Sequence, residues 1–85
     1  MIATKLTSLK QYQTRLLKEL RGSSQHVLEL VEKLDSLPLE SEIRADVEGE
    51  LYARALQLEL DAADVRKVMD EITAALPEDE TQEQN

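Results

Sequence analysis

Apolar residues recur in alternating steps of four and three along the first part of the chain. The set comprises Ile2, Leu6, Leu9, Leu16, Leu20, Val27, Leu30, Leu34 and Leu37, with Gln13 and Ser23 as its polar members. This is the a/d spacing of a coiled-coil helix. It keeps its phase across residues 22–24, where glycine and two serines cost roughly 2 kcal/mol of helix propensity. We therefore predict one continuous helix over about residues 2–35. The alternative is a three-helix bundle with a break at 22–24.

A helix stop follows in the stretch DSLPLES, residues 35–41. Pro38 has no amide hydrogen and disfavours the α conformation at Leu37, yet proline is tolerated in the first turn of a helix. We predict a second helix over about residues 39–76, with apolar positions again stepping by four and three: Leu51, Ala55, Leu58, Ala62, Val65, Met69, Ile72 and Leu76. Residues 77–85, PEDETQEQN, contain no apolar side chain and are predicted to form a disordered acidic tail.

Two helices of similar length joined by a short turn predict an all-α fold, a long antiparallel two-helix hairpin formed by residues 1–76. Around a turn at Leu37 and Pro38, residue i should face roughly residue 75 − i of the second helix. This register places the Tyr52 ring opposite Ser23, where Gly22 leaves space. It also places acidic residues of the second helix beside three basic residues of the first, Lys5, Lys10 and Arg15.

The sequence has more apolar residues than a hairpin needs, because each helix of a hairpin requires only one seam. A second stripe lies beside the seam in the middle of both helices. Such a surplus normally indicates that another helix packs there. The chain has no third helix to supply, so the surplus predicts a partner: a second copy that completes a four-helix bundle, a larger protein, or both. The predicted partner-binding residues are Leu28, Val31, Tyr52, Leu56 and Leu60.

Charge and hydropathy narrow the classes of partner. The net charge is −8, and it is uneven: residues 1–22 carry five basic and one acidic side chain, whereas residues 23–85 carry five basic and seventeen acidic ones. Such an acidic chain is not expected to bind nucleic acid directly. No apolar run approaches the length of a membrane span, and the first residues lack the apolar core of a signal peptide. We therefore expect no membrane partner and a cytoplasmic location.

The residue types needed for catalysis or metal binding are scarce. Cysteine is absent, so disulfides and thiolate ligands are excluded. His26 and Glu29 have a spacing that can place two ligands on one metal ion, but di-metal helical bundles need several glutamates and paired Glu-x-x-His elements. The single histidine leaves no nucleophile–base arrangement. We predict no catalytic residue, no cofactor and no metal site, and hence a protein that is not an enzyme.

These observations favour a non-enzymatic protein–protein interaction module, such as a small subunit, adaptor or chaperone, that acts through the apolar stripe in the middle of the hairpin. An alternative is an acidic inhibitor that mimics nucleic acid and blocks a DNA-binding protein. The dense carboxylates near the turn motivate it: Glu40, Glu42, Asp46, Glu48 and Glu50. Binding of the first kind should depend little on salt, and binding of the second kind should weaken steeply with it.

From the turn onward, the chain resembles the small subunit of exonuclease VII, an acidic helical hairpin. The resemblance rests on Leu-Pro-Leu-Glu at residues 37–40, on Gly49 eleven residues after the proline, and on Ala63, Asp64 and Arg66. It covers about thirty residues, and the basic first turns of this chain have no counterpart in that family. The resemblance implies a second alternative, a non-catalytic small subunit that coats the long helices of a nuclease.

Overall fold

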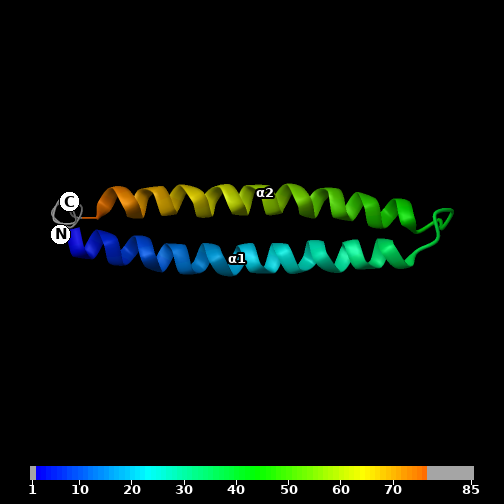
Figure 1. Ribbon diagram of the computed structural model, residues 1–85, viewed down its shortest axis with the longest axis horizontal. Coiled ribbons are helices and arrows are strands. Elements are labelled where there is room, and N and C mark those ends of the chain that lie inside the picture. Colours follow the sequence, from blue (N-terminus) through cyan, green and yellow to red (C-terminus); the bar gives the residue numbers. More distant parts are fainter. Residues whose placement is uncertain (1, 77–85) are drawn as a thin grey trace, which may run out of the picture.

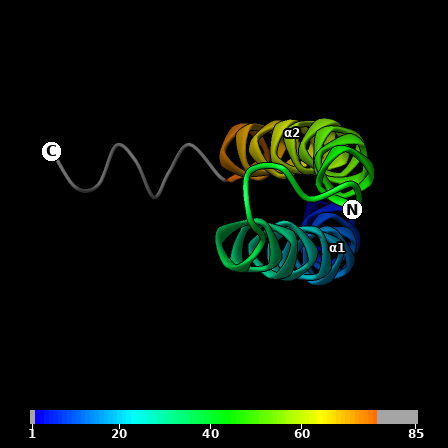
Figure 2. The ribbon, with the colours of Figure 1, turned by 90° about the vertical axis from the view of Figure 1, so that its right-hand side faces the viewer.

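The protein is an antiparallel two-helix hairpin. The computed structural model describes residues 2–76, with side chains from Thr4 onward, so the predicted acidic tail at 77–85 lies outside the described residues. α1 spans Ile2–Ser36 and α2 spans Arg44–Ala75 (Figure 1). Seen along the helices, the described part is a single layer of two helices with the turn joining them (Figure 2). The predicted all-α hairpin is confirmed.

α1 runs through the glycine–serine stretch without a break. Gly22 does not adopt a positive φ, and a Cβ atom added there would meet nothing within 4 Å. The hydroxyl of Ser24 donates a 2.8 Å hydrogen bond to the carbonyl of Leu20, so that this polar side chain is satisfied inside the helix. The three-helix alternative with a break at 22–24 is therefore wrong. Packing along the seam outweighs the local propensity cost.

The turn is longer than predicted, and α2 begins at Arg44 rather than at Leu39. Residues 37–43 form successive tight turns, in which the amide of Ser41 donates to the carbonyl of Pro38 and the amide of Arg44 donates to that of Ser41. The Arg44 guanidinium donates to the carbonyls of Leu34 and Leu37 at 3.1 and 3.3 Å. The Leu34 carbonyl also accepts from the Leu37 amide at 3.1 Å, so Arg44 ties the last turn of α1 to the first residue of the connecting turn.

The core lies along the seam between the helices. On α1 the predicted seam is confirmed: Leu16 and Leu30 are buried, and the other described seam residues are at least half-buried. On α2 the predicted positions Leu51, Leu58, Val65 and Ile72 also face α1. Two alternate positions are off by one residue: Asp61 and Val68 are buried, whereas Ala62 is half-buried and Met69 is 49% exposed. At the third, Arg54 and Ala55 are both exposed. The buried apolar residues are Leu16, Leu30, Val47, Val65 and Val68.

The longer turn shifts the register of the two helices. Contacts join Ser23 to Asp61 and His26 to Glu50, and their residue numbers add to 84 and 76, which average 80. Residue i of α1 therefore lies at the height of residue 80 − i of α2. The predicted value of 75 is too low by five, which is the delay in the start of α2.

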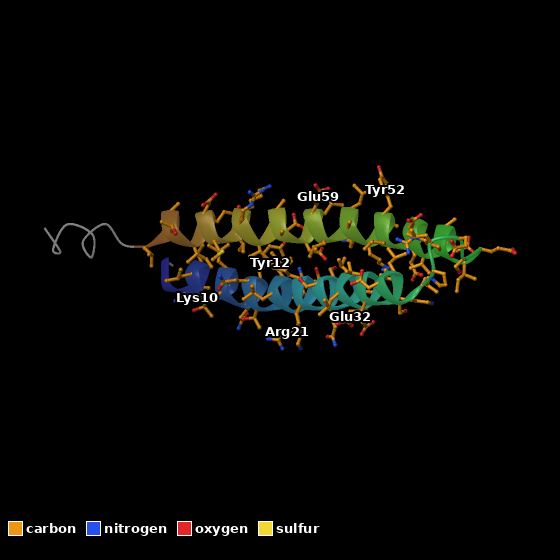
Figure 3. The ribbon with its side chains drawn as sticks, turned by 45° about the vertical axis from the view of Figure 1, so that its right-hand side comes forward. Lys10, Tyr12, Arg21, Glu32, Tyr52 and Glu59 are labelled. Carbon is orange, nitrogen blue, oxygen red and sulfur yellow. The ribbon has the colours of Figure 1, made fainter. Side chains whose placement is uncertain are left out.

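Two expectations built on the earlier register are wrong. Tyr52 does not fill space beside Ser23: it is 72% exposed and points away from α1 (Figure 3). The predicted pairs of Lys5, Lys10 and Arg15 with acidic residues of α2 do not form, since residues 4–76 contain no interhelical lysine or arginine ion pair. Arg15 lies instead over the ring of Tyr12, 4.9 Å from its centroid.

Candidate interaction surface

The two broad faces of the hairpin differ in chemistry. In a heptad, the residue before each a position and the residue after each d position lie on opposite sides of the seam. One broad face, here called the polar face, therefore carries Tyr12, Glu19, His26, Glu50, Gln57, Asp64 and Glu71. The other, the apolar face, carries Leu17, Ser24, Val31, Ala55, Ala62 and Met69 along its middle, with the charged residues Lys10 and Glu48 at its two ends. Neither broad face is covered by a third element of the described chain (Figure 2).

The polar face is crosslinked by polar contacts between the helices. The Nε2 atom of His26 lies 3.8 Å from Oε2 of Glu50, and an open groove of about 430 Å³ beside this pair is lined by Glu19, Ser23, His26, Arg54, Gln57 and Asp61. Asp61 is only 7% exposed and accepts hydrogen bonds from the hydroxyl of Ser23 and from Nε2 of Gln57, the latter at 3.0 Å. This buried carboxylate ties the two helices together at one height.

The apolar face lacks such contacts and is hollowed beside α2. A groove of about 510 Å³ is lined by Tyr52, Ala55, Leu56, Leu58, Glu59 and Ala62. The two groove residues nearest the seam are alanines, Ala55 and Ala62, and their short side chains leave open space on this face. The seam residue Leu58 is therefore only half-buried. The face is thus an open apolar surface with room for larger side chains from another helix.

The five predicted partner-binding residues are all on the surface, but the structure divides them between two places. Val31 lies on the apolar face and is 38% exposed, while Leu28 and Tyr52 border it and are 56% and 72% exposed. Leu56 and Leu60, 48% and 60% exposed, lie on the side of α2 that points away from α1. They form an outer stripe whose other members are Gly49, Ala53 and Ala63.

The outer stripe is a second heptad seam on α2. Its members step by four and three from Gly49 to Ala63, in the same way as the seam that faces α1. α2 therefore carries apolar residues on its inner side, its outer side and the apolar face. This explains why sequence periodicity misplaced part of its seam: Ala55, Ala62 and Met69 are apolar and step in phase with the seam, whereas the buried positions include the polar residue Asp61.

The apolar face also includes members that the sequence prediction did not assign to partner binding, namely Leu17, Ala55, Ala62 and Met69. Three of them were placed in the seam of α2 because they are apolar. The true seam of α2 includes Asp61 in place of Ala62. Asp61 is polar, but it can be buried because Ser23 and Gln57 donate hydrogen bonds to it. Single-chain periodicity assigns such a residue to the surface.

The part of the chain that the structure describes has neither a cluster of metal ligands nor a membrane-spanning helix. His26 is directed to Glu50 rather than grouped with Glu29, and no three acidic or histidine side chains of residues 4–76 converge as a cation site. Neither α1 nor α2 has the length and apolarity that crossing a bilayer requires. The distinguishing features of the described surface are therefore its apolar face and outer stripe.

Comparisons with protein-family models, with curated proteins and with solved structures found no match for this chain. The similarity to the exonuclease VII small subunit thus rests only on the motif residues between Leu37 and Arg66.

Proposed function

We propose that this protein is a non-enzymatic interaction module, a helical hairpin that binds another protein through apolar side chains in the middle of its length. The observation that carries the proposal is the distribution of large apolar residues. Five are buried, whereas eleven of those in residues 4–76 are exposed. Scattered exposed leucines are normal, but seven of these eleven lie on or beside the apolar face or on the outer stripe. Contiguous apolar surface marks interaction sites.

The energetics support the same proposal. A fully buried valine or leucine contributes about 1.5–3 kcal/mol, and so few buried residues give a hairpin of marginal stability once chain entropy is included. A partner that covers the exposed leucines would stabilise the folded hairpin by mass action. The protein is therefore best suited to be a subunit, adaptor or chaperone whose fold is completed by what it binds.

The outer stripe is the surface that we assign to a different, larger protein. Leu56 and Leu60 are one helical turn apart and form a ridge that a groove between two helices can accept. The experiment is the double replacement Leu56→Asp and Leu60→Asp in a tagged chain expressed in its native cell, followed by crosslinking and mass spectrometry. We expect loss of a crosslinked larger protein while the helical circular dichroism is retained.

The matched control is Gln11→Asp with Gln25→Asp, which adds the same charge on exposed positions of α1 and should leave the crosslinks unchanged. Equal recovery of the larger protein with the leucine variant would contradict the proposed role of the outer stripe. Loss of all helical signal would instead mean that these leucines stabilise the hairpin itself.

The acidic-inhibitor alternative draws on the exposed carboxylates near the turn. Glu40, Glu42 and Asp46 are exposed, whereas Glu48 lies 3.4 Å from the Arg44 guanidinium and Glu50 lies beside His26. Arg44 thus partly neutralises the charge of Glu48, which makes the cluster a weaker mimic of a phosphate backbone. A partner affinity that falls steeply between low and high salt would favour the inhibitor.

A further inference from the structure

We propose that the apolar face is covered by a second copy of this chain. The two hairpins lie side by side with their turns at the same end, so that α1 of each copy packs against α2 of the other and four helices form one bundle. This inference rests on the proposed function, because it assigns a partner to one of the two apolar surfaces. It leaves Leu60 and the far side of the outer stripe free for a different protein, while Leu56 borders the groove that the second copy covers.

The arrangement has a definite register. A twofold axis parallel to the helices moves no residue along that axis, so the relation between i and 80 − i also holds between α1 of one copy and α2 of the other. Leu28 is then level with Tyr52 of the second copy, and Arg21 is level with Glu59 of the second copy. These four residues occupy equivalent heptad positions at the margin of the apolar face.

Charge complementarity favours this arrangement. Arg21 and Glu59 are exposed, and neither has an ion-pair partner within residues 4–76. With the turns at the same end, each Arg21 meets a Glu59 of the other copy, which gives two symmetric pairs. With the turns at opposite ends and full overlap, Arg21 would meet Arg21 and Glu59 would meet Glu59. Like charges placed opposite each other disfavour that alternative.

Shape and area agree with the same arrangement. The shallow groove at Ala55 and Ala62 can accept larger side chains, and Leu17 of the second copy is level with its Ala62 end. At 1.5 Å per residue, the apolar face is about 30 Å long, and two helices are about 20 Å wide. A flat rectangle of this size has an area of roughly 600 Å², and the uneven side-chain surface adds to it. Stable interfaces bury about 800 Å² on each partner, so the face is of suitable size.

The outer stripe is a poorer surface for a second copy. Acidic side chains border it along its length, among them Asp46, Glu50, Glu59 and Asp64. A parallel pairing of α2 with α2 would bring each of these residues against itself, and an antiparallel pairing centred on Leu56 and Leu60 would bring Glu59 close to Glu59. A partner with basic flanking residues suits the stripe better.

Cysteine crosslinking tests the arrangement, since the chain has no cysteine of its own. The variants Leu28→Cys and Tyr52→Cys are prepared separately, and each is treated with a short bis-maleimide alone and in an equimolar mixture. We expect a crosslinked dimer in the mixture and almost none in either variant alone. Efficient crosslinking of Leu28→Cys with itself would place α1 against α1 and overturn the arrangement. A monomeric mass of the wild type in sedimentation equilibrium at high concentration would overturn the proposal altogether.

Charge reversal supplies a second test. Arg21→Glu should weaken the dimer about tenfold, because two favourable pairs become repulsive, and adding Glu59→Arg should restore it. Lys18→Glu makes the same charge change on the outer side of α1 and should leave the dimer intact. A double variant as weak as Arg21→Glu alone would contradict the pairing.

These results also separate this inference from the proposed function. A monomer that still loses its larger partner on replacement of Leu56 and Leu60 refutes only the second copy. A dimer with the expected crosslinks and no partner at the outer stripe refutes only the assignment of that stripe.

Discussion

The polar and apolar faces of this hairpin are built on the same two helices, yet they do opposite things. On the polar face, Asp61 binds Ser23 and Gln57, and His26 lies beside Glu50, so each helix finds polar partners on the other. On the apolar face, alanines leave a groove and larger apolar side chains stay exposed. The difference teaches that one face joins the two helices through polar contacts, while the other leaves large apolar side chains exposed.

The largest expected difference in the free energy of unfolding is between replacements at two adjacent residues, one in the seam and one on the apolar face. Val68 is 1% exposed and Met69 is 49% exposed. Val68→Asp should destabilise the hairpin by more than about 3 kcal/mol, because it buries an unpaired charge in a small core. Met69→Asp should cost less than about 1 kcal/mol at low protein concentration. Urea unfolding followed by circular dichroism measures both. Similar losses would mean that α2 is rotated relative to the position described.

A medium effect is expected on the polar face. Asp61→Ala leaves the hydroxyl of Ser23 and the amide of Gln57 without their acceptor, and we expect a loss of about 1–3 kcal/mol in the free energy of unfolding. Asp61→Leu should be less damaging or even stabilising, since apolar packing replaces a buried carboxylate.

The pair of Asp61 variants also tests the alignment role. If the carboxylate fixes the register, the leucine variant should broaden the amide NMR resonances of residues near Ser23 despite its stability. Sharp, unshifted resonances there would argue that the apolar seam alone sets the register.

The smallest effect on the hairpin itself is expected on the apolar face. Leu17 is 45% exposed, and Leu17→Ser should change the stability of the isolated hairpin by less than about 0.5 kcal/mol. At high concentration the same replacement should lower the melting temperature, because it would weaken the proposed dimer and with it the stabilisation by association. Thermal unfolding at two concentrations a hundredfold apart measures the difference. An equal change at both concentrations would remove the distinction between the two faces.

Much of the fold was predictable from local pattern. The seam of α1 was correct along its described length because its apolar residues form one stripe, and a single stripe has only one way to face a partner helix. Continuity through Gly22 followed from the unbroken phase of that stripe. The surplus of apolar residues in the middle of the chain was also predictable. The sequence alone shows that each helix has more apolar residues there than one seam requires.

The candidate surface was predictable only in part. Leu28, Val31, Tyr52, Leu56 and Leu60 were identified as surplus and are exposed, but their separation into the apolar face and the outer stripe depends on the rotation of α2. That rotation was ambiguous in the sequence, because α2 carries apolar residues on three of its sides. Their role in binding stays a prediction until the variants are measured.

The sequence by itself determined that the chain forms two long helices and that α1 has one apolar side, because helix propensity and the spacing of apolar residues act over a few turns of one segment. Only the tertiary structure decided where α2 begins, how α2 is rotated about its axis, and the register in which residues of α1 lie beside residues of α2. Those choices depend on contacts between separate segments of the chain: the Arg44 guanidinium on the carbonyls of Leu34 and Leu37, and the carboxylate of Asp61 on the hydroxyl of Ser23. No pattern within a single helix carries that information.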